Sequence, residues 1–307
     1  MSNEKETSFT VKEQAEIDEF CAKYGQYEQG RKLLFRAIEC GTLACVKFLL
    51  SEEDVNAKEY KEYDDSTLLH KVARLYDVAK PERNRRNIEI AKFLISQGAD
   101  VNAKNKLDGT PLLEAAEWCD TELVKLLVSH GADVNIAGIG KSTPLNKAIV
   151  NNAVEIVRFL ISHGADVHDK SWPPLHMAAS NSDAGVARFL VSEGFDVNAK
   201  NDQGVTPLHV ACDYWKTSPE VIQFLISEGA NVNAQDNDGK TPLHWITRYG
   251  SASGGIEIVK FLVSKGADIT KRNINGRTPL SFAKEHGNTE VVAYLSGIIV
   301  ESTPNHD

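Results

Sequence analysis

Long apolar runs are missing from this 307-residue chain, and none approaches the roughly 20 residues that a membrane-spanning helix needs. Residues 1–10 are polar and lack the apolar segment of a secretory signal. Cysteine is scarce, with five residues at irregular spacing and no CxxC pair, which argues against a disulfide framework and a structural zinc site. We therefore expect an intracellular protein in a reducing compartment, with no membrane contact.

The chain also lacks the motifs of common enzyme classes. It has no nucleophile elbow, phosphate-binding loop, HExxH pair or dinucleotide fingerprint. Basic residues are outnumbered, with 34 Lys and Arg against 43 Asp and Glu, which gives a formal charge of −9. Broad nucleic-acid binding needs a basic surface that neutralises phosphates. We expect no catalysis, no cofactor, no metal and no nucleic-acid partner.

One motif recurs along the chain instead. A segment similar to Thr-Pro-Leu-His begins at Thr67, Thr110, Thr143, Pro173, Thr206, Thr241 and Thr278. The commonest step between copies is 33 residues, as from Thr110 to Thr143. Two further signals recur with it: a Gly-Ala-Asp-Val-Asn segment, as at 98–102, and a glutamate-led apolar stretch, as at 155–161.

Each signal has a local physical role. The motif threonine can cap a first helix, and the proline after it suits the first helical position, where no N–H is needed. The glutamate-led stretch predicts a second helix. Gly98 and its equivalents are expected to end that helix in a left-handed conformation. Asn-Gly and Asp-Gly pairs, as at 275–276, predict the tight turns of a connecting finger.

Together these signals resemble the ankyrin repeat, over roughly residues 30–300. The resemblance implies an all-α repeat solenoid, a stack of helix-turn-helix units joined by short β-hairpin fingers, in which each repeat buries its apolar face against its neighbours. The domain expected at 29–300 contains eight repeats, near 29–63, 64–106, 107–139, 140–169, 170–202, 203–237, 238–274 and 275–300.

Segments outside the repeats are short. The leader, 1–28, is expected to hold a helix from about Val11 to Lys23 that covers the first repeat, with Thr10 and Glu13 forming a capping box. Residues 301–307 form a tail. The apolar residues 298–300 are expected to close the last repeat, with an oligomer contact as the alternative; alone, the chain is expected to be a monomer.

Four histidines, His70, His176, His209 and His244, occupy the fourth motif position. The resemblance implies that each imidazole bonds the motif threonine and nearby backbone. A shared metal is not expected, because stacked repeats lie roughly 10 Å apart.

Asn56, Asn102, Asn198 and Asn233 match positions that are hydroxylated in some animal ankyrin proteins. Backbone hydrogen bonding at the base of the fingers explains these asparagines without that modification.

The resemblance also implies that a partner protein binds the concave face formed by fingers and first helices. Tryptophan and tyrosine dominate binding hot spots, and aromatics recur there at the ninth motif position and around the fingers. The candidate contact residues are Trp118, Tyr214, Trp215, Trp245, Tyr249, Trp172, Tyr60 and Tyr63. The alternative is that these side chains pack under neighbouring loops.

The second repeat is ten residues longer than 33, and the extra residues are expected to form a loop near 77–87. This loop carries Arg83, Arg85 and Arg86, in the one compact basic stretch of an acidic chain. It is a further candidate for contact with a phosphate or an acidic partner; a solvated loop is the alternative.

Our first functional hypothesis is a non-catalytic adaptor or inhibitor that occupies a partner's surface. The second is a substrate-recruiting or regulatory subunit of an enzyme complex, such as a ligase receptor, or a bacterial effector that uses the repeats for targeting. A recruiting subunit normally has a docking module outside the repeats, and the leader helix is the one candidate. A third hypothesis, a small-molecule or nucleic-acid site, depends on the Arg83–Arg86 stretch alone.

Overall fold

The computed structural model describes residues 9–25, 30–51, 53–59, 64–213, 218–249 and 255–302. They belong to two compact units, which we call the N-terminal unit (1–148 with 155–165) and the C-terminal unit (149–154 with 166–307). Across these described ranges the secondary structure is helical, apart from one isolated antiparallel bridge between Lys58 and Thr67. The fingers between helix pairs are hydrogen-bonded turns, and the prediction of an all-α repeat fold is confirmed.

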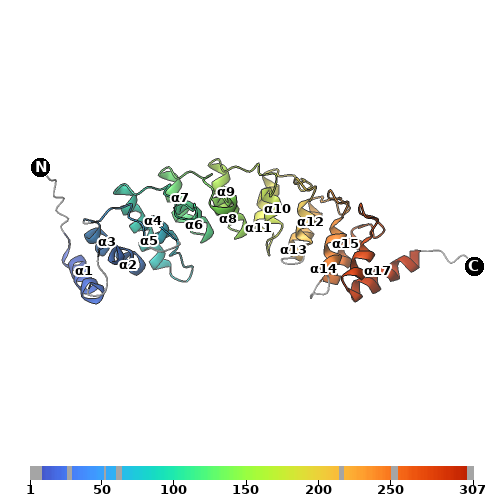
Figure 1. Ribbon diagram of the computed structural model, residues 1–307, viewed down its shortest axis with the longest axis horizontal. Coiled ribbons are helices and arrows are strands. Elements are labelled where there is room, and N and C mark those ends of the chain that lie inside the picture. The colour runs from blue at the N-terminus through green and yellow to red at the C-terminus, as the bar shows by residue number, and fades with distance from the viewer. Residues whose placement is uncertain are drawn as a thin grey trace, which may run out of the picture. The chain divides into compact units, whose positions relative to one another are not determined.

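Helices of the N-terminal unit follow one another in two rows (Figure 1). First helices α2, α4 and α6 pack side by side, and second helices α3, α5 and α7 do the same. The elements are α1 (Val11–Tyr24), α2 (Arg31–Cys40), α3 (Leu43–Leu50), α4 (Leu68–Ala73), α5 (Pro81–Ser96), α6 (Pro111–Glu117), α7 (Thr121–Ser129), η1 (Ile139–Lys141), α8 (Pro144–Val150) and α9 (Val154–Ser162). The last residues of α8 and the first of α9 fall in the other unit.

The C-terminal unit repeats the arrangement. First helices α10, α12, α14 and α16 pack in sequence, and α15 packs against α17. The elements are α10 (Pro174–Ala178), α11 (Gly185–Ser192), α12 (Pro207–Ala211), α13 (Pro219–Ser227), α14 (Pro242–Tyr249), α15 (Gly255–Ser264), α16 (Pro279–Glu285) and α17 (Thr289–Ser302).

Helix boundaries follow the predicted signals. Thr110 caps α6, and its Oγ1 accepts a hydrogen bond from the N–H of Leu113 at 3.2 Å. At the other end of a pair, Gly131 has a φ of 88°, a left-handed value that favours glycine. The next N–H, of Ala132, then donates to the carbonyl of Leu127 at 3.0 Å and closes the helix end. Thus the threonine and glycine signals correctly predict the start of α6 and the end of α7.

The leader helix is also confirmed. α1 starts after Thr10, whose hydroxyl accepts from the N–H of Glu13 while the Glu13 carboxylate accepts from the N–H of Thr10. Ile17 and Phe20 are buried, and α1 lies against α3. The leader, repeat and tail boundaries stay predictions.

The prediction of a loop near 77–87 is wrong. Residues 81–96 form α5, so the insertion lengthens a second helix toward its N-terminus. Pro81 occupies the first turn, and no glycine follows it to interrupt the helix. Within the first turn of α5, Asn84 fixes the preceding chain by exchanging two hydrogen bonds with the backbone of Asp77.

The motif histidines are structural, as expected. Nδ1 of His70 lies 2.8 Å from Oγ1 of Thr67, and Nε2 lies 2.9 Å from the carbonyl oxygen of Gly109 in the next finger. His209 and His244 make the equivalent contacts. Each of these three imidazoles therefore ties the start of its own helix to the next finger.

His176 differs because Pro173 replaces the motif threonine. Its Nε2 lies 2.8 Å from the carbonyl oxygen of Val205, but its buried Nδ1 has no hydrogen-bond partner. Proline offers neither a hydroxyl nor an N–H. A buried polar atom without a partner costs about 1–3 kcal/mol.

The Pro173→Thr variant is therefore expected to have an unfolding free energy about 1 kcal/mol higher than that of the Pro173→Ala variant. Only threonine supplies both a hydroxyl and a backbone N–H to Nδ1 of His176. Alanine is the matched control, since both substitutions remove the ring and its effect on the unfolded chain. Urea unfolding followed by circular dichroism measures the difference. Equal stability of the two variants would contradict this account of His176.

Burial also makes these histidines sensitive to acid. It lowers the pKa of all four, at His209 to about 4. The unfolded chain binds protons at the ordinary value near 6.5, so this stabilisation is complete above that pH and is lost as the pH falls toward the folded-state pKa. Through His209 alone, the unfolding free energy is expected to fall by about 2 kcal/mol when the pH is lowered from 7 to 5.

Asp120 acts in the opposite direction, because burial raises its pKa to about 6. The test is therefore the difference between the wild type and His209→Gln, measured by urea unfolding at both pH values. The variant is expected to lose less stability on acidification. A loss as large as that of the wild type would exclude His209 as the acid-sensitive group.

Asparagines at the finger bases join consecutive repeats. Nδ2 of Asn102 donates to the carbonyl of Gly131 at 3.0 Å, and its Oδ1 accepts from the N–H of Asp133 at 2.8 Å. Asn56, Asn198 and Asn233 repeat both contacts. Backbone bonding therefore accounts for all four.

Candidate interaction surface

We number each repeat from its motif threonine as position one. Position five then lies on the first helix and is charged through the N-terminal unit. Nζ of Lys71 lies 2.6 Å from Oε1 of Glu39, and Nζ of Lys147 lies 2.8 Å from Oε1 of Glu117. These charges are neutralised by partners on neighbouring repeats.

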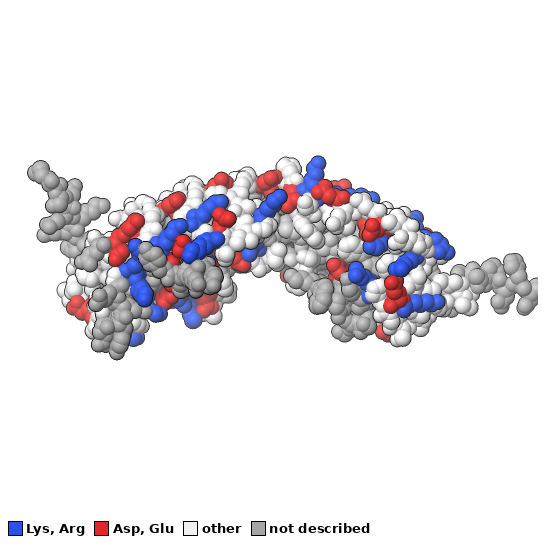
Figure 2. All heavy atoms as spheres, in the orientation of Figure 1, with Lys and Arg blue, Asp and Glu red and all other residues white. Residues whose placement is uncertain are grey.

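Glu114, the position-five residue between them, is itself buried and belongs to a partly buried network. Its Oε1 lies 2.6 Å from Nη2 of Arg74, and Nη1 of Arg74 lies 2.6 Å from Oδ2 of Asp64. The two carboxylates raise the pKa of Arg74 above its ordinary value. Figure 2 shows Lys and Arg side chains interleaved with Asp and Glu side chains on the visible face of each unit.

Position five changes character in the C-terminal unit, where it is occupied by Met177, Val210, Trp245 and Phe282. Val210 and Phe282 are buried, whereas Met177 and Trp245 are half-buried. The indole N–H of Trp245 donates to Oδ2 of Asp236 at 3.0 Å. This first-helix row is apolar where the other unit has paired charges.

A small pocket opens beside the Trp245 ring. Its volume is about 80 Å³. It is lined by Asp213, Lys240, His244, Trp245, Arg248 and Phe282.

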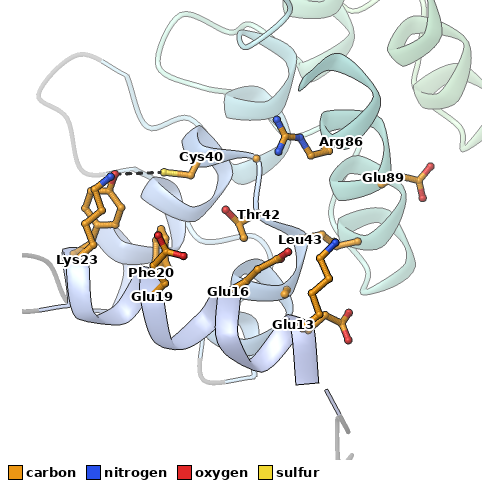
Figure 3. A pocket seen from close by; sticks show the side chains of 14 residues that line it. Glu13, Glu16, Glu19, Phe20, Lys23, Cys40, Thr42, Leu43, Arg86 and Glu89 are labelled. Carbon is orange, nitrogen blue, oxygen red and sulfur yellow. Dashed lines mark hydrogen bonds between the residues drawn. The ribbon is translucent and has the colours of Figure 1, made fainter. Parts of the chain in front are cut away.

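A larger pocket, of about 610 Å³, lies between the leader helix and the repeats. Figure 3 shows Glu16 and Glu19 extending from α1, and Arg86 on α5 across the turn between α2 and α3. Phe20, Tyr24 and Leu43 contribute apolar surface. Acids and bases both line it, so its charge selects no single class of ligand.

The three candidate arginines do not point to one site. Nη2 of Arg83 donates to the carbonyl of Glu39 near the C-terminus of α2, at 2.9 Å, where a cation is favoured. Arg85 pairs with Glu82 in an exposed position. Arg86 lines the larger pocket.

Comparison with known proteins decides the family. The family model for ankyrin repeats, in its three-copy form, matches residues 75–171, 167–236 and 215–304. The chain belongs to the ankyrin-repeat family. No curated protein sequence matches it.

Two solved structures are similar to these ankyrin repeats. The human ASB11 ankyrin repeat domain has a TM-score of 0.61 and 25% identity, covering 74% of this chain and 97% of that one. The ankyrin repeat domain of Bcl-3, a member of the IkappaB protein family, has a TM-score of 0.55 and 26% identity, covering 72% of this chain and 95% of that one. Ankyrin repeats are protein–protein interaction modules, which supports the predicted class of function.

The aromatic candidates are distributed over both units. Trp118 follows α6 at position nine and is 49% exposed, and Trp172 in a finger is 54% exposed. Tyr60, Tyr63, Tyr214 and Trp215 lie outside the described residues, and so does the side chain of Tyr249 at the end of α14.

Position nine, which we expected on the concave binding face, is not exposed in every repeat. Asn151 and His286 are exposed, as Trp118 is, but Asn181 is buried. The Asn181 amide donates to the carbonyl of Ile149 at 2.7 Å, so it bonds the C-terminal turn of α8 in the preceding repeat instead of facing a partner.

The described residues contain no group of three or more His, Cys, Asp or Glu arranged to hold a metal. Burial raises the pKa of Cys45 to about 12 and also raises that of Cys212, so both thiols stay protonated at neutral pH. Cys40, by contrast, is exposed.

None of the helices among the described residues is long and apolar enough to span a bilayer.

Proposed function

We propose that this ankyrin-repeat protein is a non-catalytic scaffold that binds a partner protein on the finger and first-helix face of its C-terminal unit. The observation that carries the proposal is the apolar row at position five, with the half-buried Trp245 at its centre. The corresponding positions of the N-terminal unit already hold charges that are neutralised by ion-pair partners.

Energetic reasons favour the apolar row. A partner that covered Lys71 or Lys147 would remove water from an ion pair and gain little in return. Covering Met177 and the ring of Trp245 instead removes apolar surface from water, which contributes roughly 25 cal/mol per Å². Tryptophan is also enriched among residues that dominate binding energy.

The proposal is tested by a crosslinking pull-down from the native source. The wild type is compared with a variant in which Tyr214, Trp245 and Tyr249 of the C-terminal unit are replaced by alanine, after circular dichroism shows that the variant is folded. We expect a protein captured by the wild type and lost by the variant. The same capture by both proteins would mean that the aromatics pack within the scaffold, and the proposed face would be wrong.

A second candidate function is that of a recruiting or regulatory subunit, and the pocket of about 610 Å³ beside α1 favours it. A docking module there would use the leader helix together with the turn before Leu43. Deleting residues 1–28 separates the two functions. Loss of assembly with an unchanged melting temperature would favour the recruiting role, whereas assembly that survives the deletion would reject it.

A further inference from the structure

We infer that the groove between the second helices α13 and α15 binds a small molecule that carries a guanidinium group on an apolar body. The groove belongs to the second helices of the C-terminal unit, whereas the proposed partner surface belongs to the fingers and first helices. The inference therefore goes beyond the proposed function and does not depend on it.

A row of cations runs along the second helices and is interrupted at this groove. The row occupies the sixth position before the glycine that follows each helix, and its members are Lys92, Lys125, Arg158, Arg188, Gln223 and Lys260. Three positions earlier, most second helices carry a glutamate, as at Glu155, Glu220 and Glu257. Gln223 thus places a neutral side chain in a row of Lys and Arg.

Two members of the row show what the cation does. Nζ of Lys125 on α7 lies 2.5 Å from Oε1 of Glu155 on α9, so this pair joins two successive second helices. Nη2 of Arg188 on α11 lies 3.5 Å from Oε1 of Glu220 on α13 and joins the next such pair in the C-terminal unit.

Arg188 also covers an aromatic ring of the neighbouring helix. Its Cζ lies 4.7 Å from the centroid of the Phe224 ring, within the range of a cation–π contact. Phe224 is buried, with 7% of its surface exposed. One arginine therefore pairs with a carboxylate and shields a phenylalanine between α11 and α13.

The next groove, between α13 and α15, has glutamine at the arginine position. Gln223 has no charge, so it cannot form an ion pair with Glu257 or a cation–π contact with Phe261, the counterpart of Phe224. Phe261 is half-buried, and a groove of about 520 Å³ opens here. Its apolar walls are formed by Pro219, Ile222, Ile258 and Phe261. The ring and the carboxylate that receive an arginine in one groove are thus repeated in the next.

Charge around the groove favours a cation. The second helices α11, α13, α15 and α17, each taken with the residue that follows it, carry more acids than bases. The acids are Glu193, Glu220, Glu228, Glu257, Glu290 and Glu301, and the bases are Arg188, Lys260 and Lys265. An acidic ligand would add to this excess of negative charge, whereas a cationic ligand reduces it.

Glu257 shares its own cation with another carboxylate. Nζ of Lys260 lies 2.9 Å from Oε1 of Glu257, and both side chains are exposed. Glu257 raises the pKa of Lys260, and Glu290 on α17 adds to this effect. Lys265 approaches the Phe261 ring, with Nζ 5.5 Å from its centroid, but does not line the groove. One cation therefore serves two carboxylates where the row would provide two.

Size indicates a small molecule instead of a single side chain. Sites for small molecules measure about 300–1,000 Å³ and are mainly apolar, and this groove falls within that range. A guanidinium is planar, stacks on aromatic rings and bonds a carboxylate through two N–H groups. The ligand class is therefore an alkyl- or arylguanidine, with its cation at Glu257 and Phe261 and its body along the apolar walls.

The test is a titration of the full chain with phenylbutylguanidine, followed by NMR of isotope-labelled isoleucine methyl groups. Ile222 and Ile258 line the groove, so their methyl signals report on binding. We expect saturable shifts of both signals, and at least tenfold weaker binding of phenylbutylurea, which has nearly the same shape without the charge. Equal affinities for the two compounds, or no shift of either methyl signal, would overturn the inference.

Gln223→Arg supplies the missing cation from the chain itself. The substitution is expected to weaken binding of the guanidine at least tenfold, because the new side chain occupies the position of the ligand. Gln97→Arg is the matched control, since it adds the same charge at an exposed position of the N-terminal unit. It is expected to change the affinity by less than twofold.

Glu257→Gln removes the carboxylate while the apolar walls stay in place. The affinity for the guanidine is expected to fall at least fivefold, and both Gln223 and Glu257 are exposed, so neither substitution disturbs the core. Binding that is unchanged in Gln223→Arg and in Glu257→Gln would contradict the assignment of the site.

Discussion

Arg74→Met is expected to lower the unfolding free energy by about 3–4 kcal/mol, because the substitution leaves two carboxylates without their cation. The guanidinium of Arg74 lies 2.6 Å from both Asp64 and Glu114. Glu114 is only 8% exposed, so water replaces the lost partner incompletely. Methionine keeps most of the volume of the side chain, so the expected effect comes from the charge and not from a cavity.

Urea unfolding of the full chain measures this effect. The matched control is Lys92→Met in the same unit, since Lys92 pairs with Glu89 at 2.9 Å and both side chains are more than half exposed. Exposed pairs contribute at most about 1 kcal/mol. Similar losses for Arg74→Met and Lys92→Met would contradict the role given to this partly buried network.

Leu127→Ala is expected to cost about 3 kcal/mol of unfolding free energy, through lost burial and the cavity left behind. Leu127 is fully buried in α7, and its carbonyl also receives the N–H of Ala132 that closes the helix. Each repeat gains stability from its neighbours, so the adjacent helices α5 and α6 are expected to lose stability as well.

Hydrogen exchange followed by mass spectrometry shows where protection is lost. Leu107→Ala is the control, because Leu107 sits on a finger and is 51% exposed. We expect faster exchange in α5 to α7 with Leu127→Ala and no measurable change with Leu107→Ala. Exchange that increased equally in both variants would show that Leu127 does not hold the repeats together.

Sequence predicted the parts of the fold that depend on local chemistry. Threonine caps, glycines at positive φ and the histidine bridges each need a particular residue at a particular place, so their recurrence identified the repeat. The prediction of a loop around the arginine segment was wrong because the ten extra residues show only how long the insertion is, and not which structure it forms. Whether it forms a loop or extends a helix depends on Pro81, on Asn84 and on the surface that α5 covers.

The candidate site was found only in part. Trp245 was selected as an aromatic at a non-motif position, but its pairing with Asp236 was missed because the residues lie nine positions apart in different elements. A signal was available: aligned by their fingers, three repeats have asparagine where the fourth has aspartate. The sequence also did not show that the charged residues at position five are already neutralised. That became visible only in the structure, where Glu39 pairs with Lys71 and Arg74 pairs with Glu114.

Site-specific photo-crosslinking tests the proposed binding face most directly. A benzophenone side chain is placed at Arg248, beside the pocket on α14, or at Gln223, which is exposed on the second helix α13 of the same unit. Both proteins are irradiated with extract from the native source, and the captured band is identified. The account predicts one specific band from position 248 and none from position 223. The same partner crosslinked from position 223 but not from position 248 would place the binding surface on the second helices and contradict the account.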